Sequence, residues 1–194
     1  MTPSPSRPAW VACSRARLRH NLGLLARAVG GASRVMAVLK ADAYGHGAEQ
    51  AALCLESAGV RSFGVATLEE GMALRRAKVK GAILLLGPLE PSLGPAASRA
   101  RISASVWNRL WLDEASRFLG PRRILDVHLK VDTGMARLGV FPDEAPGFLA
   151  DFAAKRWSGL SLAGAYTHLA CADERRDRAS MGQLEAFGAL PWPQ

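Results

Sequence analysis

The stretch MAVLKADAYGHGAEQAAL, residues 36–53, places a lysine between two different structural patterns. An apolar run typical of a buried strand ends at Lys40, and a polar, glycine-containing turn then leads into an alanine-rich helical segment. A lysine at a strand end can simply reach into water. A partly desolvated amine at the same place can instead act as a nucleophile towards an aldehyde. The stretch therefore predicts a βα unit that presents Lys40 for chemistry.

The same alternation of strand and helix repeats along the chain. Strands of 4–8 residues that alternate with helices of 10–15 residues indicate βαβ units and a parallel sheet. A doubly wound sheet and a (β/α)₈ barrel both fit this pattern, but no G-x-G-x-x-G motif follows the first strand to support dinucleotide binding. The expected strands are residues 34–40, 61–66, 81–87, 101–106, 123–132 and 160–170, and the expected helices are 15–29, 47–59, 67–78, 107–120, 141–155 and 178–190.

Local signals fix the ends of several of these helices. Ser14 is an expected N-cap for the helix over 15–29, the Gly30-Gly31 pair is an expected stop, and leucines recur at helical spacing between them. Thr67 and Glu70 form the Thr-x-x-Glu pattern of a capping box. Residues 90–100 read as a loop with a short helical turn.

Composition excludes several classes of protein. The 194 residues are 49% hydrophobic, which allows a sizeable core, and no apolar run approaches the roughly 20 residues that span a bilayer. The net charge of +8 comes from 20 arginines scattered along the chain against 5 lysines, without the aromatic-interleaved basic stripe of a nucleic-acid module. Cys13, Cys54 and Cys171 are far apart, which supports neither a metal site nor a disulfide framework and favours a cytoplasmic location.

Polar residues gather where two further strands end. HLKVDTGMARLG, residues 128–139, contains Lys130, Asp132 and Arg137, which could form a simple ion pair or a binding site. YTHLACADE, residues 166–174, contains His168, which could equally be a hydrogen-bonded structural residue. The C-terminal ends of strands form the active-site face of a (β/α)₈ barrel, so all three strand ends are candidate sites. The acidic pair at residues 173–174 is expected at a helix start, where negative charge is favourable.

Taken together, these motifs resemble the alanine racemase family. AVLKADAYGHG, residues 37–47, is similar nearly letter for letter to the segment to which pyridoxal 5'-phosphate is attached in that family. The resemblance implies that Lys40 holds the cofactor as a Schiff base and moves the α-proton on one face of the substrate, and that Tyr44 contacts the cofactor phosphate. It extends to the K-x-D-T-G-M-x-R-L-G pattern and to the Y-T-H-x-A-x-A-D-E pattern, and covers the chain from about Trp10.

The other site residues follow from the same resemblance. Arg137 matches an arginine that faces the phenolic oxygen of the cofactor and the substrate carboxylate. Lys130 matches a lysine that is often carboxylated by carbon dioxide, a change that would place an anion beside the guanidinium. His168 matches a histidine that orients the catalytic groups. No metal is implied, and the implied substrate is a small amino acid, alanine.

The resemblance also implies what lies beyond this sequence. The fold expected for residues 10–194 is about six units of a TIM-type (β/α)₈ barrel, preceded by a disordered lead-in over residues 1–9. In the family a C-terminal β-domain follows, supplies a tyrosine as the second base to the partner of a homodimer, and is absent here. A chain of this extent alone is expected to be poorly stable and weakly active. A cofactor-binding module without catalysis and an inert remnant are the alternatives.

Overall fold

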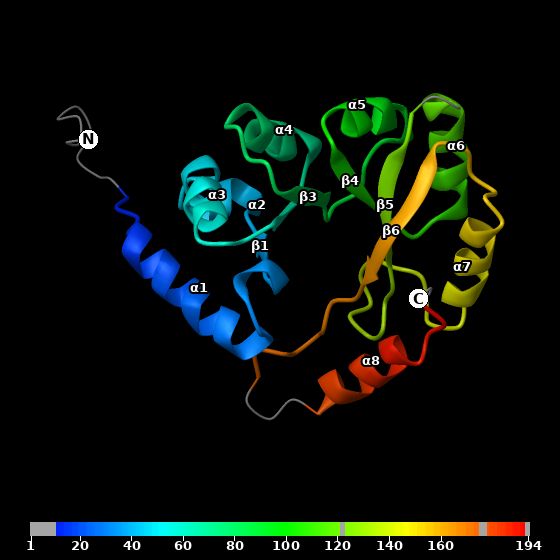
Figure 1. Cartoon of the computed structure of the whole chain (residues 1–194). Helices are drawn as coiled ribbons and strands as arrows, with labels where there is room; N and C mark the ends of the chain where they lie inside the picture. The colour runs from blue at the N-terminus through cyan, green and yellow to red at the C-terminus, as the bar shows by residue number, and fades with distance from the viewer. Residues whose placement is uncertain (1–10, 121–122, 175–177, 193–194) are drawn as a thin grey trace. The chain divides into compact units, whose positions relative to one another are not determined.

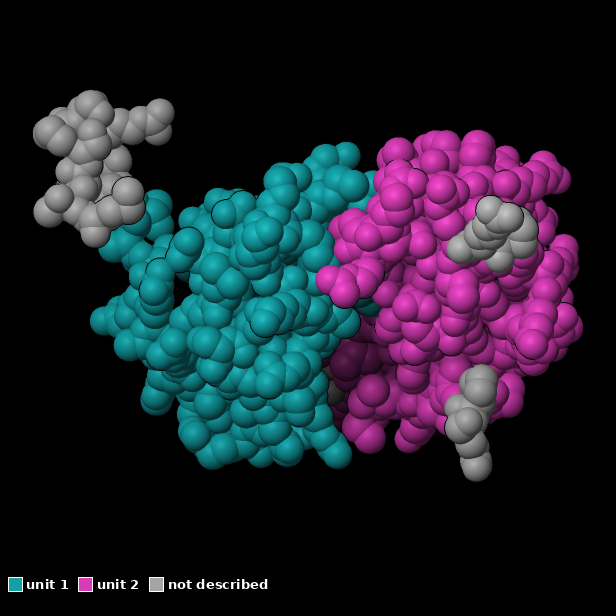
Figure 2. Space-filling model, turned by 45° about the horizontal axis from the view of Figure 1, so that its top comes forward, with its two compact units in different colours: residues 1–84 teal, residues 85–194 magenta. Residues whose placement is uncertain are grey.

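The computed structural model describes residues 11–120, 123–174 and 178–192 of the chain. The chain divides into two compact units, residues 1–84 and residues 85–194, which Figure 2 shows in different colours. The lead-in expected over residues 1–9 lies outside the described residues. None of the described helices is long and apolar enough to cross a membrane.

Unit 1 begins with a long helix and continues as alternating short strands and helices (Figure 1). Its first two strands pair in parallel, with Met36 opposite Ser62 and Val38 opposite Gly64. Its elements are α1 (Arg15–Val29), η1 (Ala32–Arg34), β1 (Met36–Val38), α2 (Lys40–Gly45), α3 (Ala48–Ser57), β2 (Ser62–Val65), α4 (Leu68–Arg76) and β3 (Ala82–Leu85), the last of which ends at the first residue of unit 2.

Unit 2 repeats the same plan with longer strands. Strand β5 pairs in parallel with β4 on one side and with β6 on the other, and a bulge between Val127 and His128 shifts the β5–β6 register by one residue. Its elements are η2 (Pro91–Leu93), α5 (Gly94–Arg99), β4 (Ile102–Val106), α6 (Arg109–Leu119), β5 (Leu125–Lys130), α7 (Ala145–Ala153), β6 (Leu160–Tyr166) and α8 (Ala179–Gly188).

The strands follow one another in chain order, β1-β2-β3-β4-β5-β6, as repeated βα units with parallel strands require. Fully buried side chains occur on strands of both units: Phe63 and Val65 on β2, and Leu125, Val127 and Leu129 on β5. Near-continuous burial along a strand is typical of a parallel sheet covered by helices. The predicted α/β class with six successive units is confirmed.

The ends of the helices agree closely with the local signals. The Ser14 hydroxyl accepts the Arg17 N–H at 3.3 Å to begin α1, and Gly30 ends it in the left-handed conformation with φ 83°. The capping box of α4 has both of its hydrogen bonds. Along α1, only Leu22 is buried among the described residues, while Leu25 is 57% exposed.

The segment after β1 differs most from the expectation. The strand ends at Val38, two residues before Lys40, and Lys40 begins a single helical turn, α2. The four residues from Ala41 to Tyr44 have φ of 52–55° and ψ of 38–49°, which is a left-handed helical turn. Each L-residue in that conformation costs roughly 1–2 kcal/mol, since its Cβ crowds the following carbonyl oxygen. The neighbouring structure therefore has to stabilise this turn.

Two carboxylates, one within the turn and one on α4, supply part of that stabilisation. One oxygen of Asp42 accepts the Ala48 N–H at 2.7 Å, which links the turn to the first residue of α3. One oxygen of Glu70, on α4, accepts the Ala41 N–H at 2.8 Å. Both bonds are charge-assisted, and each joins the turn to a neighbouring helix of unit 1.

Candidate active site

Lys40 and Tyr44 lie at the two ends of the left-handed turn in unit 1. The Lys40 ammonium nitrogen is 5.9 Å from the centroid of the Tyr44 ring, and the tyrosine is 62% exposed. Within the described part of the chain, no hydrogen bond or ion pair engages the Lys40 side chain. The turn thus presents a half-buried amine and an exposed phenol that remain available to a ligand.

In unit 2, the Asp132 carboxylate organises the loop that follows β5. It accepts the backbone N–H groups of Gly134 at 2.9 Å, Ala136 at 3.0 Å and Arg137 at 2.9 Å. Burial alone would raise the pKa of Asp132, but these three bonds and the nearby Lys130 charge together hold that pKa below its ordinary value. No ion pair within the described residues joins Asp132 to Lys130 or Arg137, so its role is to hold backbone rather than to neutralise a side chain.

The same loop closes on itself and returns Arg137 to the end of β5. Val131 and Val140 form a parallel bridge, the Asp132 N–H donates to Val140 O at 2.8 Å, and the Val140 N–H donates to Lys130 O at 2.9 Å. Gly139 makes this closure possible, with φ at 130° and a position where a Cβ would lie 2.5 Å from the Asp132 nitrogen. The closed loop presents the Arg137 side chain at an exposed position.

Lys130 is the last residue of β5 and is only 3% exposed. Its ammonium nitrogen lies 5.3 Å from the centroid of the Tyr166 ring and has no hydrogen-bond acceptor among the described residues. Burial lowers the pKa of the Lys130 ammonium, Asp132 partly opposes that shift, and Arg137 adds to it. A buried cation without an acceptor is costly, which favours a neutral or modified form of this amine.

Tyr166, at the end of β6, is fixed by a hydroxyl relay. The Ser105 hydroxyl donates to Leu85 O at 2.6 Å and lies 2.8 Å from the Tyr166 hydroxyl. Because Ser105 has a single hydrogen, Tyr166 is then the donor in the second bond. Burial has the largest effect on Tyr166 and raises its pKa. The hydrogen bond with Ser105 and the charge of Arg137 lower the pKa by a smaller amount. Tyr166 therefore stays a neutral phenol beside Lys130.

A buried glutamine ties together the loops after β5 and β6. Gln183, on α8, is 5% exposed; its amide oxygen accepts the Ala170 N–H at 3.0 Å and its amide nitrogen donates to the Thr133 hydroxyl at 3.4 Å. Thr133 and Thr167 are joined by a 2.8 Å bond between their hydroxyls. These contacts connect the loop that carries Arg137 to the loop that carries His168.

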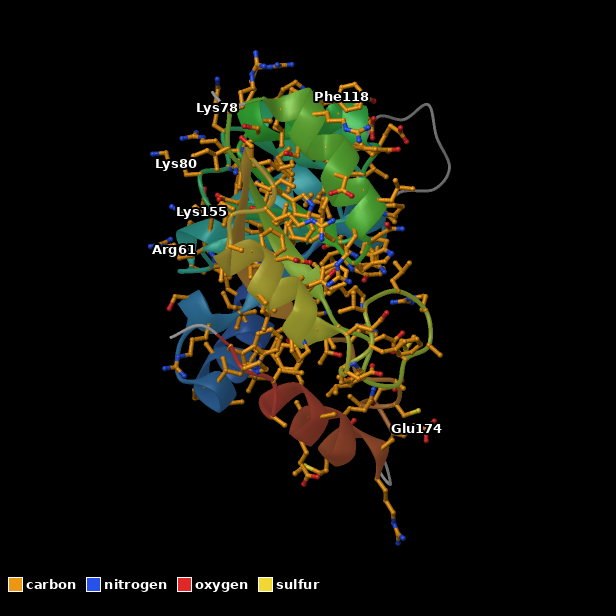
Figure 3. All side chains as sticks on the ribbon, turned by 90° about the vertical axis from the view of Figure 1, so that its right-hand side faces the viewer. Arg61, Lys78, Lys80, Phe118, Lys155 and Glu174 are labelled. Atoms are coloured by element: carbon orange, nitrogen blue, oxygen red, sulfur yellow. The ribbon has the colours of Figure 1, made fainter. Side chains whose placement is uncertain are left out.

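The remaining predicted polar residues lie on the loop after β6. His168 is exposed and comes two residues after the end of the strand. The prediction that residues 173–174 begin a helix is wrong, because α8 starts at Ala179, after Arg178 in the N-cap position. Figure 3 shows Glu174 pointing away from the ribbon. Within the described residues, no group of three or more His, Cys, Asp or Glu side chains could hold a metal ion.

Asp132→Asn should destabilise the chain by about 2 kcal/mol, since an amide offers one acceptor oxygen to three backbone donors and lacks the charge that strengthens such bonds. A carboxylate whose pKa is lower in the folded state stabilises it above the unfolded pKa of about 3.9, and that contribution disappears as the pH falls through the folded value. The variant should therefore lose part of the acid dependence of its free energy of unfolding. Urea unfolding at neutral and acid pH measures both effects.

Asp143→Asn is the matched control, because Asp143 lies close to the same loop and accepts none of its backbone N–H groups among the described residues. Equal unfolding midpoints for the Asp132 and Asp143 variants at neutral pH would contradict the assigned role of Asp132.

Sequence motifs made Lys40, Tyr44, Lys130, Arg137 and His168 candidates for the site. They did not single out Ser105, Tyr166 or Gln183. Tyr166 stands directly before the Thr-His pair, so its position was a usable signal. The contacts of Ser105 and Gln183 join residues far apart in the chain, and no local sequence pattern predicts such contacts.

Comparison with known proteins shows the family of the chain and agrees with its fold. The family profile described as "Alanine racemase, N-terminal domain" matches residues 13–190. An alanine racemase of Citrifermentans bemidjiense is 40% identical over 172 residues, which cover 87% of this chain and 45% of that protein. The crystal structure of alanine racemase from Oenococcus oeni superposes with a TM-score of 0.82 at 31% identity, covering 93% of this chain and 53% of that one.

A histidine racemase from Leuconostoc mesenteroides gives a TM-score of 0.87 at 28% identity, with 97% of this chain and 52% of that chain covered. The chain spans about half the length of the curated relatives it matches, 45% of one and 50% of another. The match to the family profile over most of the residues, together with the fold, shows that the chain belongs to the alanine racemase family and corresponds to its N-terminal domain.

Proposed function

We propose that the chain serves a pyridoxal phosphate-dependent racemase that interconverts L- and D-alanine. The observation that carries the proposal is Lys40: an amine without a hydrogen-bond or ion-pair partner in the described residues, held just after β1 by a strained turn, in a member of the alanine racemase family. Strained backbone of this kind persists where the surrounding structure enforces it, and it clusters at functional sites.

The chemistry of the available side chains suits this cofactor. Pyridoxal phosphate has an aldehyde, a phosphate and a phenolic oxygen, which call for an amine and for hydrogen-bond donors. Lys40 supplies the amine, the Tyr44 phenol and the Arg137 guanidinium are donors, and both donor side chains are exposed. We assign cofactor attachment to Lys40, cofactor contacts to Tyr44, Arg137 and His168, and the substrate carboxylate to Arg137.

When bound, the cofactor would act as an electron sink for the carbanion at the substrate Cα. The protein has to do the rest. The Lys40 amine is the base that removes or returns the α-proton on one face of the substrate. Arg137 would orient the substrate carboxylate through its planar fork of donors, since the Asp132 carboxylate holds the Arg137 backbone without engaging its side chain.

Lys130 is the proposed site of carboxylation by carbon dioxide. The ammonium first loses one proton to water, and the neutral amine would then attack the carbon of CO₂. An N–C bond forms, one C=O electron pair moves to oxygen, and a second proton leaves the nitrogen to water. The product is an anion in place of a buried cation that has no acceptor in the described residues. It would offer the Arg137 guanidinium a bidentate partner. It would also relieve the burial of an ammonium, the main cause of the lowered Lys130 pKa, and the smaller repulsion from Arg137.

Added bicarbonate should raise the unfolding midpoint of the parent chain and add the mass of one CO₂, because a group that joins only the folded state stabilises it by mass action. Lys130→Met should show neither effect. Without bicarbonate, that variant should be more stable than the parent by about 1 kcal/mol or more, since it no longer buries an ammonium.

Native mass spectrometry and urea unfolding with and without bicarbonate measure these changes. Lys80→Met, at an exposed lysine, is the control and should respond to bicarbonate as the parent does. A plain amine mass for the parent at every bicarbonate concentration would remove the carboxylation.

Alanine is the substrate we propose, and a supply of D-alanine for the peptidoglycan of the cell wall is the role. A solved histidine racemase resembles the chain as well as the alanine racemases do, so other amino acids are the comparison substrates. We further infer a cytoplasmic protein, because its three cysteines lie far apart in the sequence and support no disulfide framework, and we infer that it works as a homodimer in its full-length form.

The direct test is incubation of the purified chain with pyridoxal phosphate and L-alanine in D₂O. A racemase places deuterium at the alanine Cα, which proton NMR detects. A cofactor-binding module would bind the cofactor without exchange, and an inert remnant would do neither. Exchange on alanine faster than on histidine supports the proposal, and no exchange on any amino acid contradicts it for this chain.

A further inference from the structure

We propose that Glu70 is a positioning residue for Lys40, and that it does more than cap the helix that carries it. The inference rests on the proposed function in one respect: it takes Lys40 as the residue that carries the cofactor. Its structural content is separate from catalysis. Glu70 would fix the Lys40–Ala41 peptide and thereby the direction in which the Lys40 side chain leaves the backbone.

The two oxygens of Glu70 perform different tasks. Oε2 accepts the N–H groups of Ala66 at 2.7 Å and Thr67 at 3.3 Å, at the start of α4. The Thr67 hydroxyl accepts the Glu70 N–H in return, which completes the capping box. Oε1 is not needed for the cap. It accepts the N–H of Ala41, a residue 29 positions earlier in the chain, at 2.8 Å.

The Ala41 N–H belongs to the peptide whose carbonyl carbon is that of Lys40. A charge-assisted bond to this group restricts the rotation of the peptide plane at Lys40. Ala41 is also the first of the four left-handed residues, so the bond acts where the chain enters its strained conformation. Without this hydrogen bond, the turn could relax more easily to a right-handed or extended backbone conformation, which L-residues prefer.

Lys40 depends on this backbone control because its side chain has no other anchor in the described residues. Its ammonium approaches the Tyr44 ring only to 5.9 Å, and Tyr44 belongs to the same turn. A side chain held by neither an ion pair nor a hydrogen bond takes its direction from its own Cα. The carboxylate of α4, bonded to the adjoining peptide, therefore helps to determine where the amine points.

Three variants separate positioning from capping. Glu70→Ala removes both tasks, Thr67→Ala removes the other half of the capping box but leaves the bond to Ala41, and Glu69→Ala removes a second carboxylate from the same helical turn. Hydrogen exchange of the Ala41 amide, followed by NMR in the chain without cofactor, reports the bond directly. The rate at which added pyridoxal phosphate becomes attached to the chain reports its consequence for Lys40.

Glu70→Ala should speed exchange at Ala41 by about tenfold or more, because one hydrogen bond to a charged acceptor is lost. Thr67→Ala and Glu69→Ala should leave exchange at Ala41 within about twofold of the parent, although loss of the cap lowers the melting temperature in the Thr67 variant. Cofactor attachment should slow in Glu70→Ala alone. If Glu70→Ala does not fold, Glu70→Gln, which has one acceptor oxygen instead of two, should show a smaller change in the same direction.

Equal changes at Ala41 in the Glu70 and Thr67 variants would overturn the proposal and reduce Glu70 to a cap. The amide measurement needs no cofactor, so it is independent of the proposed activity. A parent chain that fails to attach pyridoxal phosphate would contradict the proposed function, whereas the Ala41 exchange rates would still decide the role of Glu70.

Discussion

Lys40→Ala should reduce deuterium exchange at the Cα of L-alanine by about 10²-fold or more, because the variant loses both the nucleophile that attaches the cofactor and a base for the α-proton. Its structural effect should be small. Lys40 is half-buried and has no hydrogen bond or ion pair to lose in the described residues, and an alanine side chain at this position would not strain the turn that follows. Lys40→Ala should therefore lower the rate of deuterium exchange and leave the unfolding midpoint nearly unchanged.

Lys80→Ala is the matched control for that experiment. Lys80 is also in unit 1, and Figure 3 shows its side chain directed away from the ribbon. The Lys80 contact with Glu56 is made by its backbone N–H, which alanine keeps. Unchanged exchange in Lys80→Ala together with its loss in Lys40→Ala would assign the chemistry to one amine. Equal exchange in both variants would contradict that assignment.

Gly139→Ala should destabilise the chain by about 3 kcal/mol, since a side chain is strained at a positive φ and the new Cβ would also meet rigid backbone. That Cβ would lie 2.5 Å from the Asp132 nitrogen and 2.8 Å from the carbonyl carbon of Val131. Neither atom can move without breaking the bridge between Val131 and Val140. If the bridge breaks, the three backbone hydrogen bonds to the Asp132 carboxylate and the position of Arg137 should be lost as well.

Gly182→Ala tests the same chemical change where the structure accepts it. Gly182 lies within α8, and an added Cβ there would meet no atom within 4 Å. Alanine in a helix interior should stabilise the chain by roughly 0.5–1 kcal/mol. Urea unfolding of both variants measures the contrast. A Gly139 variant as stable as the parent would show that the loop after β5 is not held as described.

The sequence predicted those parts of the fold that depend on neighbouring residues. Ser14 and Gly30 mark the two ends of α1, and the Thr67 and Glu70 pattern marks the start of α4, because each acts within one helical turn. The alternation of short strands and helices predicted the order of the βα units in the same way. Spacing predicted the helix α1 but does not say whether another surface covers Leu25, which is 57% exposed.

The rest of the site depends on contacts between distant residues. No propensity favours a left-handed turn over residues 41–44, because none of the four is glycine; bonds from outside the turn help to hold it. Sequence motifs identified Lys130 as a candidate but not its missing acceptor, which follows from burial beside Tyr166. The family resemblance suggested the chemistry, and the structure adds the backbone contacts that hold the turn after Lys40 and the loop of Arg137.

A visible absorption spectrum of the chain with added pyridoxal phosphate shows whether Lys40 attaches the cofactor. A band of lysine-linked cofactor should appear in the parent and in Lys80→Ala, and it should be absent from Lys40→Ala. Identical spectra for the parent and Lys40→Ala would contradict this attachment, because the strained turn after β1 would then present an amine that the cofactor does not use.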